Sequence, residues 1–217
     1  MITEAVYLHY LNAILQGDKQ QCIRIVENLL DSKVELKDIY LHLFQRSLYR
    51  IGKMWESRRC SVAEEHIATK ITESLIDFTL LHCCCENKSN KSVVISCVDK
   101  EFHEIGARMV AALFEVNGWN TLFLGSNTPR EELVEITSTH RPDIVGISAN
   151  LYLNISRLIK SIDRIKSAVP DQEILIGGQA LSNGLCESLV NCDNVKYINS
   201  LDDLSKYIEH YKSKAEG

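Results

Sequence analysis

The spacing of apolar residues changes once along this 217-residue chain, at the polar stretch CENKSNKS over residues 85–92. Before that stretch, apolar residues recur every three or four positions, as in amphipathic helices, and no proline interrupts them. After it, short apolar runs alternate with helix-length amphipathic segments, which is typical of β-strands connected by helices. The change predicts two domains of different class, a helical bundle over residues 1–85 and an α/β domain over residues 92–217.

The first domain is predicted to be a four-helix bundle. Its apolar residues follow helical spacing over residues 5–15, 22–30, 36–54 and 67–81. Asp18 with Gln21, and Ser61 with Glu64, have the spacing of capping boxes, in which each residue satisfies a backbone amide of the other. We therefore expect the second helix to begin after Asp18 and the last helix after Ser61.

The second domain is predicted to be a five-stranded parallel sheet covered by helices on both faces. Its five strands are the runs SVVISC, NTLFLG, DIVGIS, EILIGG and VKYI. Thr128 with Glu131, around Pro129, and Ser200 with Asp203 are interpreted as capping boxes of two of the connecting helices. In such sheets ligands bind beyond the carboxyl ends of the strands, so functional residues are expected in the loops at that edge.

Composition narrows the function classes. A net charge of -5 and a pI near 5.8 argue against a nucleic-acid-binding surface, which needs a basic face. The N-terminal residues lack the pattern of a signal peptide, and no run is long enough to span a membrane, so we expect a soluble, cytoplasmic protein. The eight cysteines have no C-x-x-C spacing and are interpreted as reduced, structural thiols, with the run Cys83, Cys84, Cys85 as a helix end rather than a redox or ligand-tethering site.

His103 is the most informative single residue, in the stretch DKEFHEIGARM directly after the first strand. It could be a buried core histidine, a general acid or base, or a metal ligand. Its position in a loop at the carboxyl edge favours a functional role over the core. Gly106 allows close approach of a ligand to the backbone, and Gly177 and Gly178 mark a second close approach after the fourth strand. The spacing G-x-G-x-x-G is absent, which argues against NAD or FAD.

The pattern E-x-H-x-x-G after the first strand, Ser148 after the third and Gly-Gly after the fourth resembles the cobalamin-binding domain. The resemblance implies a flavodoxin-like, or Rossmann-like, fold in which His103 binds cobalt from below and Glu101 holds the imidazole. It implies that the following residues bind the cofactor: Glu101, Phe102, Gly106, Ser148, Asn150, Gly177 and Gly178. Glu101 stands where the family more often has aspartate, and Asn150 stands where it has leucine.

The helical half resembles the cap of the CarH-type light-sensing regulators, through Trp55, Glu65 and His66 in the arrangement W-x9-E-H. In that family the bundle covers the upper face of adenosylcobalamin. The resemblance implies that Trp55 stacks over the adenosyl group, that Val62 lines its pocket, that Glu65 hydrogen-bonds it and that His66 lies beside it. Glu56 stands where these regulators carry a histidine, and a carboxylate is a poorer ligand than imidazole for cobalt.

The resemblance implies a light-responsive adenosylcobalamin sensor, without catalytic residues of its own, that signals through a partner such as a transcription regulator or through a change of oligomeric state. No direct contact with DNA and no membrane contact are expected. The alternative is a corrinoid carrier that serves separate methyltransferases, which has the same two-domain layout but needs an upper face open to its partners.

Overall fold

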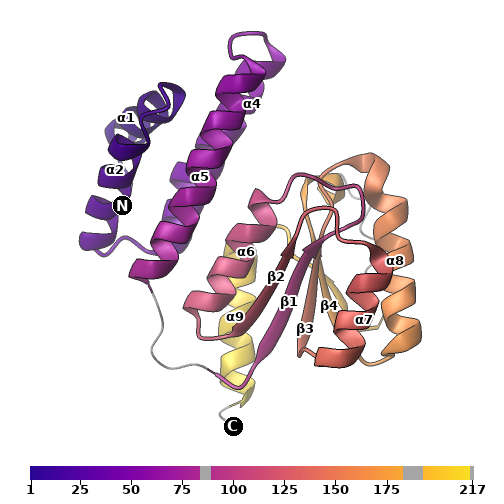
Figure 1. Cartoon of the computed structure of the whole chain (residues 1–217). Helices are drawn as coiled ribbons and strands as arrows, with labels where there is room; N and C mark the ends of the chain where they lie inside the picture. Colours follow the sequence, from indigo (N-terminus) through magenta and orange to yellow (C-terminus); the bar gives the residue numbers. More distant parts are fainter. Residues whose placement is uncertain (84–88, 183–192, 216–217) are drawn as a thin grey trace. The chain divides into compact units, whose positions relative to one another are not determined.

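The computed structural model describes residues 1–83, 89–182 and 193–215 and divides the chain into two compact units, Met1–Cys84 and Cys85–Gly217 (Figure 1). The polar stretch at which the apolar spacing changes therefore coincides with the junction between the units. Cys84 and Cys85 lie outside the described residues, so the interpretation of the cysteine run is not tested there. Within the described ranges, no helix combines the length and apolar character needed to cross a membrane.

The first unit is helical, as the sequence predicts. Its elements are α1 (Glu4–Leu15), α2 (Lys19–Asp31), α3 (Leu36–Ile39), η1 (Tyr40–Gln45), α4 (Arg46–Glu56) and α5 (Val62–His82). The third predicted helix differs from the expectation, because α3 and α4 are joined by η1, a turn of π-helix rather than α-helix. Such a widened turn is rare, and apolar periodicity read over the whole segment does not reveal it.

Two of the predicted helix starts are capped as follows. The Ser61 N–H donates to Glu64 Oε2 at 2.7 Å and the Glu64 N–H donates to Ser61 Oγ at 3.2 Å, so the predicted capping box of α5 is confirmed. Asp18 accepts the Gln21 N–H at 2.9 Å, but the Gln21 side chain accepts from Arg24 instead of returning to Asp18. Only one of the two expected bonds of that box is formed.

The core of the helical unit is built around three aromatic rings. Tyr10, Tyr40 and Phe44 are completely buried, and their neighbouring ring centroids lie 5.5 to 5.9 Å apart. The Tyr40 hydroxyl is 2.7 Å from Thr79 Oγ1 of α5, so this polar group is satisfied inside the core. Because η1 supplies two of the three rings, the π turn belongs to the packed interior of the unit.

The second unit is a parallel sheet with the strand order β2-β1-β3-β4-β5, which is the flavodoxin-like order. The strands are β1 (Ser92–Cys97), β2 (Asn120–Gly125), β3 (Ile144–Ser148), β4 (Glu173–Gly177) and β5 (Val195–Tyr197). The helices are α6 (Ile105–Val116), α7 (Arg130–His140), α8 (Ile155–Ala168) and α9 (Leu201–Ala215), with short 3-10 turns η2 (Tyr152–Asn154) and η3 (Gln179–Leu181) after β3 and β4. In Figure 1, α6 and α9 cover one face of the sheet and α7 and α8 cover the other.

Burial on both faces explains why the central strands are continuously apolar. Val145 and Ile147 of β3 pack with Leu133 of α7 and Leu158 of α8, and all four side chains are buried. Each such side chain contributes about 1.5–3 kcal/mol of hydrophobic stabilisation. The sheet is thereby held rigidly beneath the loops that follow its strands.

The two capping boxes predicted in this unit differ in outcome. Ser200 accepts the Asp203 N–H at 3.1 Å and donates to the Asp203 carboxylate at 3.0 Å, so a cap forms before α9. The box at Thr128 is wrong: Pro129 occupies the cap position of α7, and the Thr128 hydroxyl donates to the Gly125 carbonyl at 3.3 Å. The helix begins one residue later than predicted, because Thr128 is used to close the turn that follows β2.

Candidate functional site

The carboxyl edge of the sheet brings three predicted site segments together. Cys97 at the end of β1 pairs with Ser148 at the end of β3, and Ser148 pairs with Gly177 at the end of β4. The loops that follow these three residues carry His103, Asn150 and Gly178 respectively. The parallel register therefore converts three sequence motifs that lie far apart in the chain into neighbours.

Glu101 is the centre of this edge. Its side chain is completely buried, and it accepts hydrogen bonds from two segments of the chain, the His103 loop and the segment that follows β3. Oε1 accepts the His103 N–H at 3.1 Å, while Oε2 accepts the Asn150 N–H at 2.8 Å and the Leu151 N–H at 2.9 Å. Oε2 also accepts from Asn154 Nδ2 at 3.1 Å. Burial alone would raise the pKa of Glu101, but these hydrogen bonds outweigh burial and lower its pKa to about 2.

The ionised Glu101 fixes the ring of His103. The distance from His103 Nδ1 to Glu101 Oε1 is 2.7 Å, and because a carboxylate can only accept, Nδ1 carries the proton. The other ring nitrogen, Nε2, then holds a lone pair. The His103 side chain is 65% exposed, which excludes the core-histidine alternative and leaves Nε2 able to bind a metal from outside.

Asn150 connects the His103 loop to the Gly-Gly loop. Its Nδ2 donates to the His103 carbonyl at 2.8 Å, and its Oδ1 accepts the Gln179 N–H at 3.2 Å. Leucine, the residue more common at this position, could make neither bond. The departure from the family pattern therefore produces a polar link between two loops of the site.

The glycines of the edge have different local roles. Gly178 has a φ of +107°, and a Cβ there would collide with the backbone of Ala149. The close approach predicted after the fourth strand is therefore a contact between Gly178 and the Ala149 backbone of the same chain. A Cβ at Gly177 would lie 3.4 Å from the Ile198 carbonyl oxygen. At Gly106, in the first turn of α6, a Cβ would meet no protein atom within 4 Å. Open space beside the backbone is thus available at Gly106.

Phe102 and Ser148 are the remaining predicted residues at this edge of the sheet. Phe102, next to His103, is 66% exposed. Ser148 is half-buried at the end of β3. Below them, burial raises the pKa of Cys97 to about 12, so Cys97 is a neutral structural thiol, as expected for the cysteines of this chain.

Leu151 and Asn154 are contributors that the sequence reasoning missed. Both hold the Glu101 carboxylate, and the Asn154 side chain also donates to the Lys100 carbonyl at 3.2 Å. They lie 50 and 53 residues from Glu101 in the sequence. The only available signal was their position just after the third strand, at the same edge as His103.

The helical unit carries the remaining predicted residues at the corner between α4 and α5. Trp55 is 48% exposed and Val62 is 53% exposed, so both present apolar surface that the helical unit itself does not cover. Glu65 Oε1 accepts from Thr69 Oγ1 at 3.0 Å, and Glu65 Oε2 lies 3.7 Å from His66 Nε2. Glu65 is therefore held in place within α5, whereas His66 extends into solvent.

Comparison with known protein families identifies the family of this chain. Residues 91–193 match the B12 binding domain, and residues 8–78 match a second family that is also described as a B12 binding domain. The chain is a cobalamin-binding protein. The family resemblance of the E-x-H-x-x-G motif is confirmed, and so is the predicted order of a helical domain followed by a parallel α/β domain.

Two relatives of this cobalamin-binding protein differ in how much of their length matches this chain. The HTH-type transcriptional repressor CarH of Myxococcus xanthus is 28% identical over 142 residues, which cover 64% of this chain and 47% of the repressor. The chain thus spans about half of the repressor's length. Trimethylamine corrinoid protein 1 of Methanosarcina acetivorans is 21% identical over 183 residues, which cover 82% of this chain and 85% of that protein.

The structure of the monomethylamine corrinoid protein of Methanosarcina barkeri has the same fold as the cobalamin-binding protein. It is 16% identical in sequence, and the superposition has a TM-score of 0.80 over 95% of this chain and 98% of that chain. At this level of identity the agreement concerns the fold.

The residues of the sheet edge fit a corrinoid. Cobalamin carries cobalt in a macrocycle that already supplies four ligands, so the protein needs to offer one axial nitrogen and space beside it. His103 offers a lone pair on Nε2, and the space beside Gly106 contains no protein atom within reach of a Cβ. The buried Glu101 meets the requirement that a metal-binding histidine have its second nitrogen held by an acceptor.

Proposed function

We propose that this protein is a corrinoid carrier that presents a methyl group to separate methyltransferases. The observation that supports it most is the fold, which corresponds to that of a monomethylamine corrinoid protein over nearly the whole of both chains. The match to trimethylamine corrinoid protein 1 likewise extends over most of both chains. No catalytic side chain of its own is required, because a carrier positions its cofactor for the active sites of its partners.

The residues of this chain would perform three tasks in that role. His103 would bind cobalt through Nε2, and Glu101 would keep the proton on Nδ1 so that this nitrogen stays available. Asn150 would keep the His103 loop and the Gly-Gly loop at a fixed separation. When bound, the corrinoid supplies a cobalt centre that can accept and release a methyl group.

A second candidate function is the adenosylcobalamin light sensor, with output through a protein partner or a change in oligomeric state. It is favoured by one observation, the exposed apolar side chains of Trp55 and Val62 beside Glu65. These three residues offer a flat ring, an aliphatic side chain and a hydrogen-bond acceptor, which suit an adenosyl group. Under this candidate function, the helical unit would select the adenosyl form.

Binding of the two cobalamin forms separates the candidates. If the protein is a carrier, methylcobalamin and adenosylcobalamin are expected to bind with dissociation constants within about threefold of each other by calorimetry. A preference of more than about tenfold for the adenosyl form would contradict the carrier and support the sensor. Size-exclusion chromatography in darkness and after green light provides a second measurement, since a sensor that signals through its oligomeric state must change that state on illumination.

Two matched variants test whether Trp55 determines the ratio of the adenosylcobalamin and methylcobalamin affinities. Trp55→Ala is compared with Tyr49→Ala, because both side chains belong to α4 and both are 48% exposed. For a carrier, the two variants should leave the ratio of the two affinities unchanged. A selective loss of adenosylcobalamin binding in Trp55→Ala alone would assign that residue to the adenosyl group and overturn the carrier proposal.

A further inference from the structure

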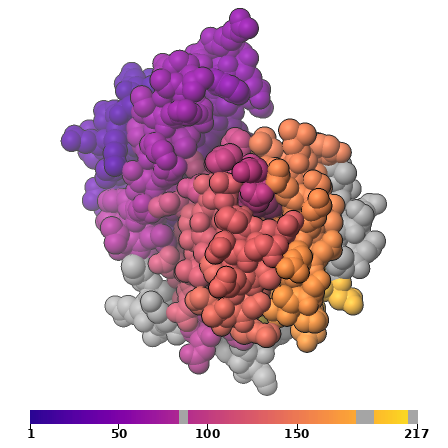
Figure 2. All heavy atoms as spheres, turned by 45° about the vertical axis from the view of Figure 1, so that its right-hand side comes forward, coloured from indigo at the N-terminus to yellow at the C-terminus, as the bar shows by residue number. Residues whose placement is uncertain are grey.

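A cavity of about 230 Å³ lies between α7 and α8, on the face of the sheet opposite to α6 and α9. Figure 2 turns the α7 and α8 surface toward the viewer. The lining residues come from the first residue of α7, from η2, from the first half of α8 and from the loop after β1: Asp99, Arg130, Leu153, Ser156, Arg157, Lys160 and Ser161. None of the residues that hold Glu101 or His103 lines this cavity.

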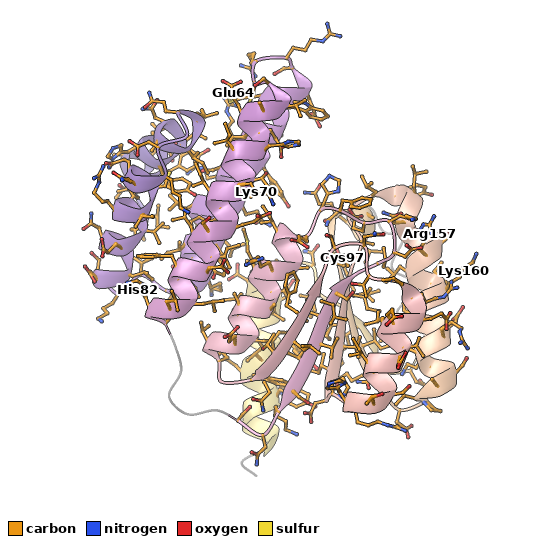
Figure 3. All side chains as sticks on the ribbon, viewed as in Figure 1. Glu64, Lys70, His82, Cys97, Arg157 and Lys160 are labelled. Carbon is orange, nitrogen blue, oxygen red and sulfur yellow. The ribbon has the colours of Figure 1, made fainter. Side chains whose placement is uncertain are left out.

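The lining is positively charged, although the whole chain is acidic. Arg130, Arg157 and Lys160 are cationic, and Asp99 is the single carboxylate, so the cavity carries two net positive charges. The chain as a whole has a net charge of -5. Figure 3 shows the Arg157 and Lys160 side chains extending from α8. A concentration of positive charge against this background indicates a site for an anion.

The ion pairs around the cavity leave this charge available. Arg157 Nη1 lies 2.7 Å from Asp99 Oδ2, which neutralises one cation. Arg130 contacts Glu131 at 3.2 Å, but Glu131 is also bound by Arg164 at 2.8 Å, so that carboxylate is shared between two guanidinium groups. For Lys160 the described residues provide no carboxylate within ion-pair distance.

Ser161 adds a hydroxyl to the lining of the cavity. The residue is only 2% exposed and it lines the cavity, so its hydroxyl can donate to a ligand held there. Ser167, on the same helix, instead donates to the carbonyl of Asp163 four residues earlier.

We propose that this cavity binds the dianionic phosphate of a small phosphorylated molecule. A phosphate monoester has two negative charges, which match the two net positive charges of the lining. Its oxygens can accept from Lys160, from the guanidinium of Arg130 and from the Ser161 hydroxyl. Ser156 is the second residue of α8, where the free amides of the first turn favour an anion. A carboxylate, with one charge and two oxygens, would leave part of this donor set unused.

The proposal is tested by calorimetric titration of the cobalamin-loaded full-length protein with inorganic phosphate and with glycerol 3-phosphate. The titrations are carried out at mildly alkaline pH and constant ionic strength, with acetate as the control anion. Saturable binding of both phosphate probes is expected, together with weaker binding of acetate. Absence of saturable phosphate binding, or equal affinity for acetate, would overturn the proposal.

Three variants locate the site. Lys160→Gln is expected to weaken phosphate binding about tenfold and Ser161→Ala to weaken it measurably, because each removes one donor to the anion. Lys206→Gln is the matched control, since it removes the same charge from an exposed position on α9, on the other face of the sheet. If both Lys160→Gln and Lys206→Gln weakened phosphate binding equally, the binding would depend only on the overall charge of the protein, and a specific site would be contradicted.

A comparison with the cobalamin-free protein distinguishes the two sources of phosphate. Cobalamin itself contains a phosphodiester, which has one negative charge. If the cavity is a separate site, inorganic phosphate binds equally well with and without cobalamin. Phosphate binding that disappears when cobalamin is added would assign the cavity to the cofactor and overturn the proposal.

Discussion

At the scale of single residues, Glu101 is the residue on which the conformation of the His103 loop depends. Its buried carboxylate accepts five hydrogen bonds, and glutamine has only one oxygen with which to replace the two. We expect Glu101→Gln to lower the free energy of unfolding by about 1–3 kcal/mol, because buried amide donors lose their acceptor. We also expect cobalamin affinity to fall by about 10–100-fold, because the His103 ring is no longer held by a carboxylate. Urea denaturation and calorimetry measure the two effects.

The control for this prediction is Glu115→Gln, which changes an exposed carboxylate on α6. It is expected to leave both stability and cobalamin affinity near the wild-type values. If Glu101→Gln bound cobalamin as tightly as Glu115→Gln, the role assigned to Glu101 in orienting His103 would be incorrect.

Among the elements, the pairing of β1 with β3 depends on a carboxylate at its amino end. Asp143, just before β3, accepts the Ser92 N–H at 2.8 Å and the Lys91 ammonium at 3.1 Å. Burial would raise the pKa of Asp143, but the hydrogen bond from Ser92 and the charge of Lys91 outweigh it, and the pKa is lowered. Since the folded-state pKa lies below the unfolded value of about 3.9, Asp143 stabilises the fold above that pH, and this contribution is lost as the pH falls through the folded-state pKa.

We therefore expect Asp143→Asn to be less stable than wild type by about 1 kcal/mol near neutral pH, with the difference shrinking below a pH of about 4. Denaturation midpoints across an acid pH series measure this trend. Asp171→Asn, which changes an exposed carboxylate of the same unit, is the control and should follow the wild-type curve. A stability difference for Asp143→Asn that stayed constant down to acid pH would show that the charge of Asp143 is not responsible.

For the molecule as a whole, the division into two compact units leads us to expect that each unit folds independently. The helical unit and the α/β unit each contain completely buried side chains, Phe44 and Ile144 among them. His103, Glu101 and Asn150 all belong to the second unit. We expect residues 89–217, produced alone, to unfold cooperatively in a circular-dichroism melt and to bind cobalamin, with a visible spectrum that changes in His103→Ala.

His140→Ala provides the matched comparison in that fragment, because His140 is an exposed histidine on α7 away from the His103 loop. Its spectrum with cobalamin should equal that of the unsubstituted fragment. A fragment that fails to fold, or that gives the same spectrum in His103→Ala, would contradict the independence of the second unit or the assignment of the cobalt ligand.

Local sequence was sufficient for the class of both units and for the candidate cobalt ligand. Apolar spacing is a property of neighbouring residues, so it predicted the four helical segments and the five strands. The motif around His103 is equally local, because the imidazole and Glu101 lie two residues apart. Where a local competitor existed, the prediction was wrong, as at Thr128, whose hydroxyl bonds backward to Gly125 instead of capping α7.

Only the tertiary structure could identify the partners of Glu101 and the cavity between α7 and α8. Asn150, Leu151 and Asn154 reach Glu101 from 49 to 53 residues away because the register of β1 with β3 places their loop beside it. Ser161 could be recognised as part of the cavity lining only after α8 was placed on the sheet. Burial and hydrogen-bond satisfaction depend on which distant segments pack together, and a single sequence contains no direct record of that packing.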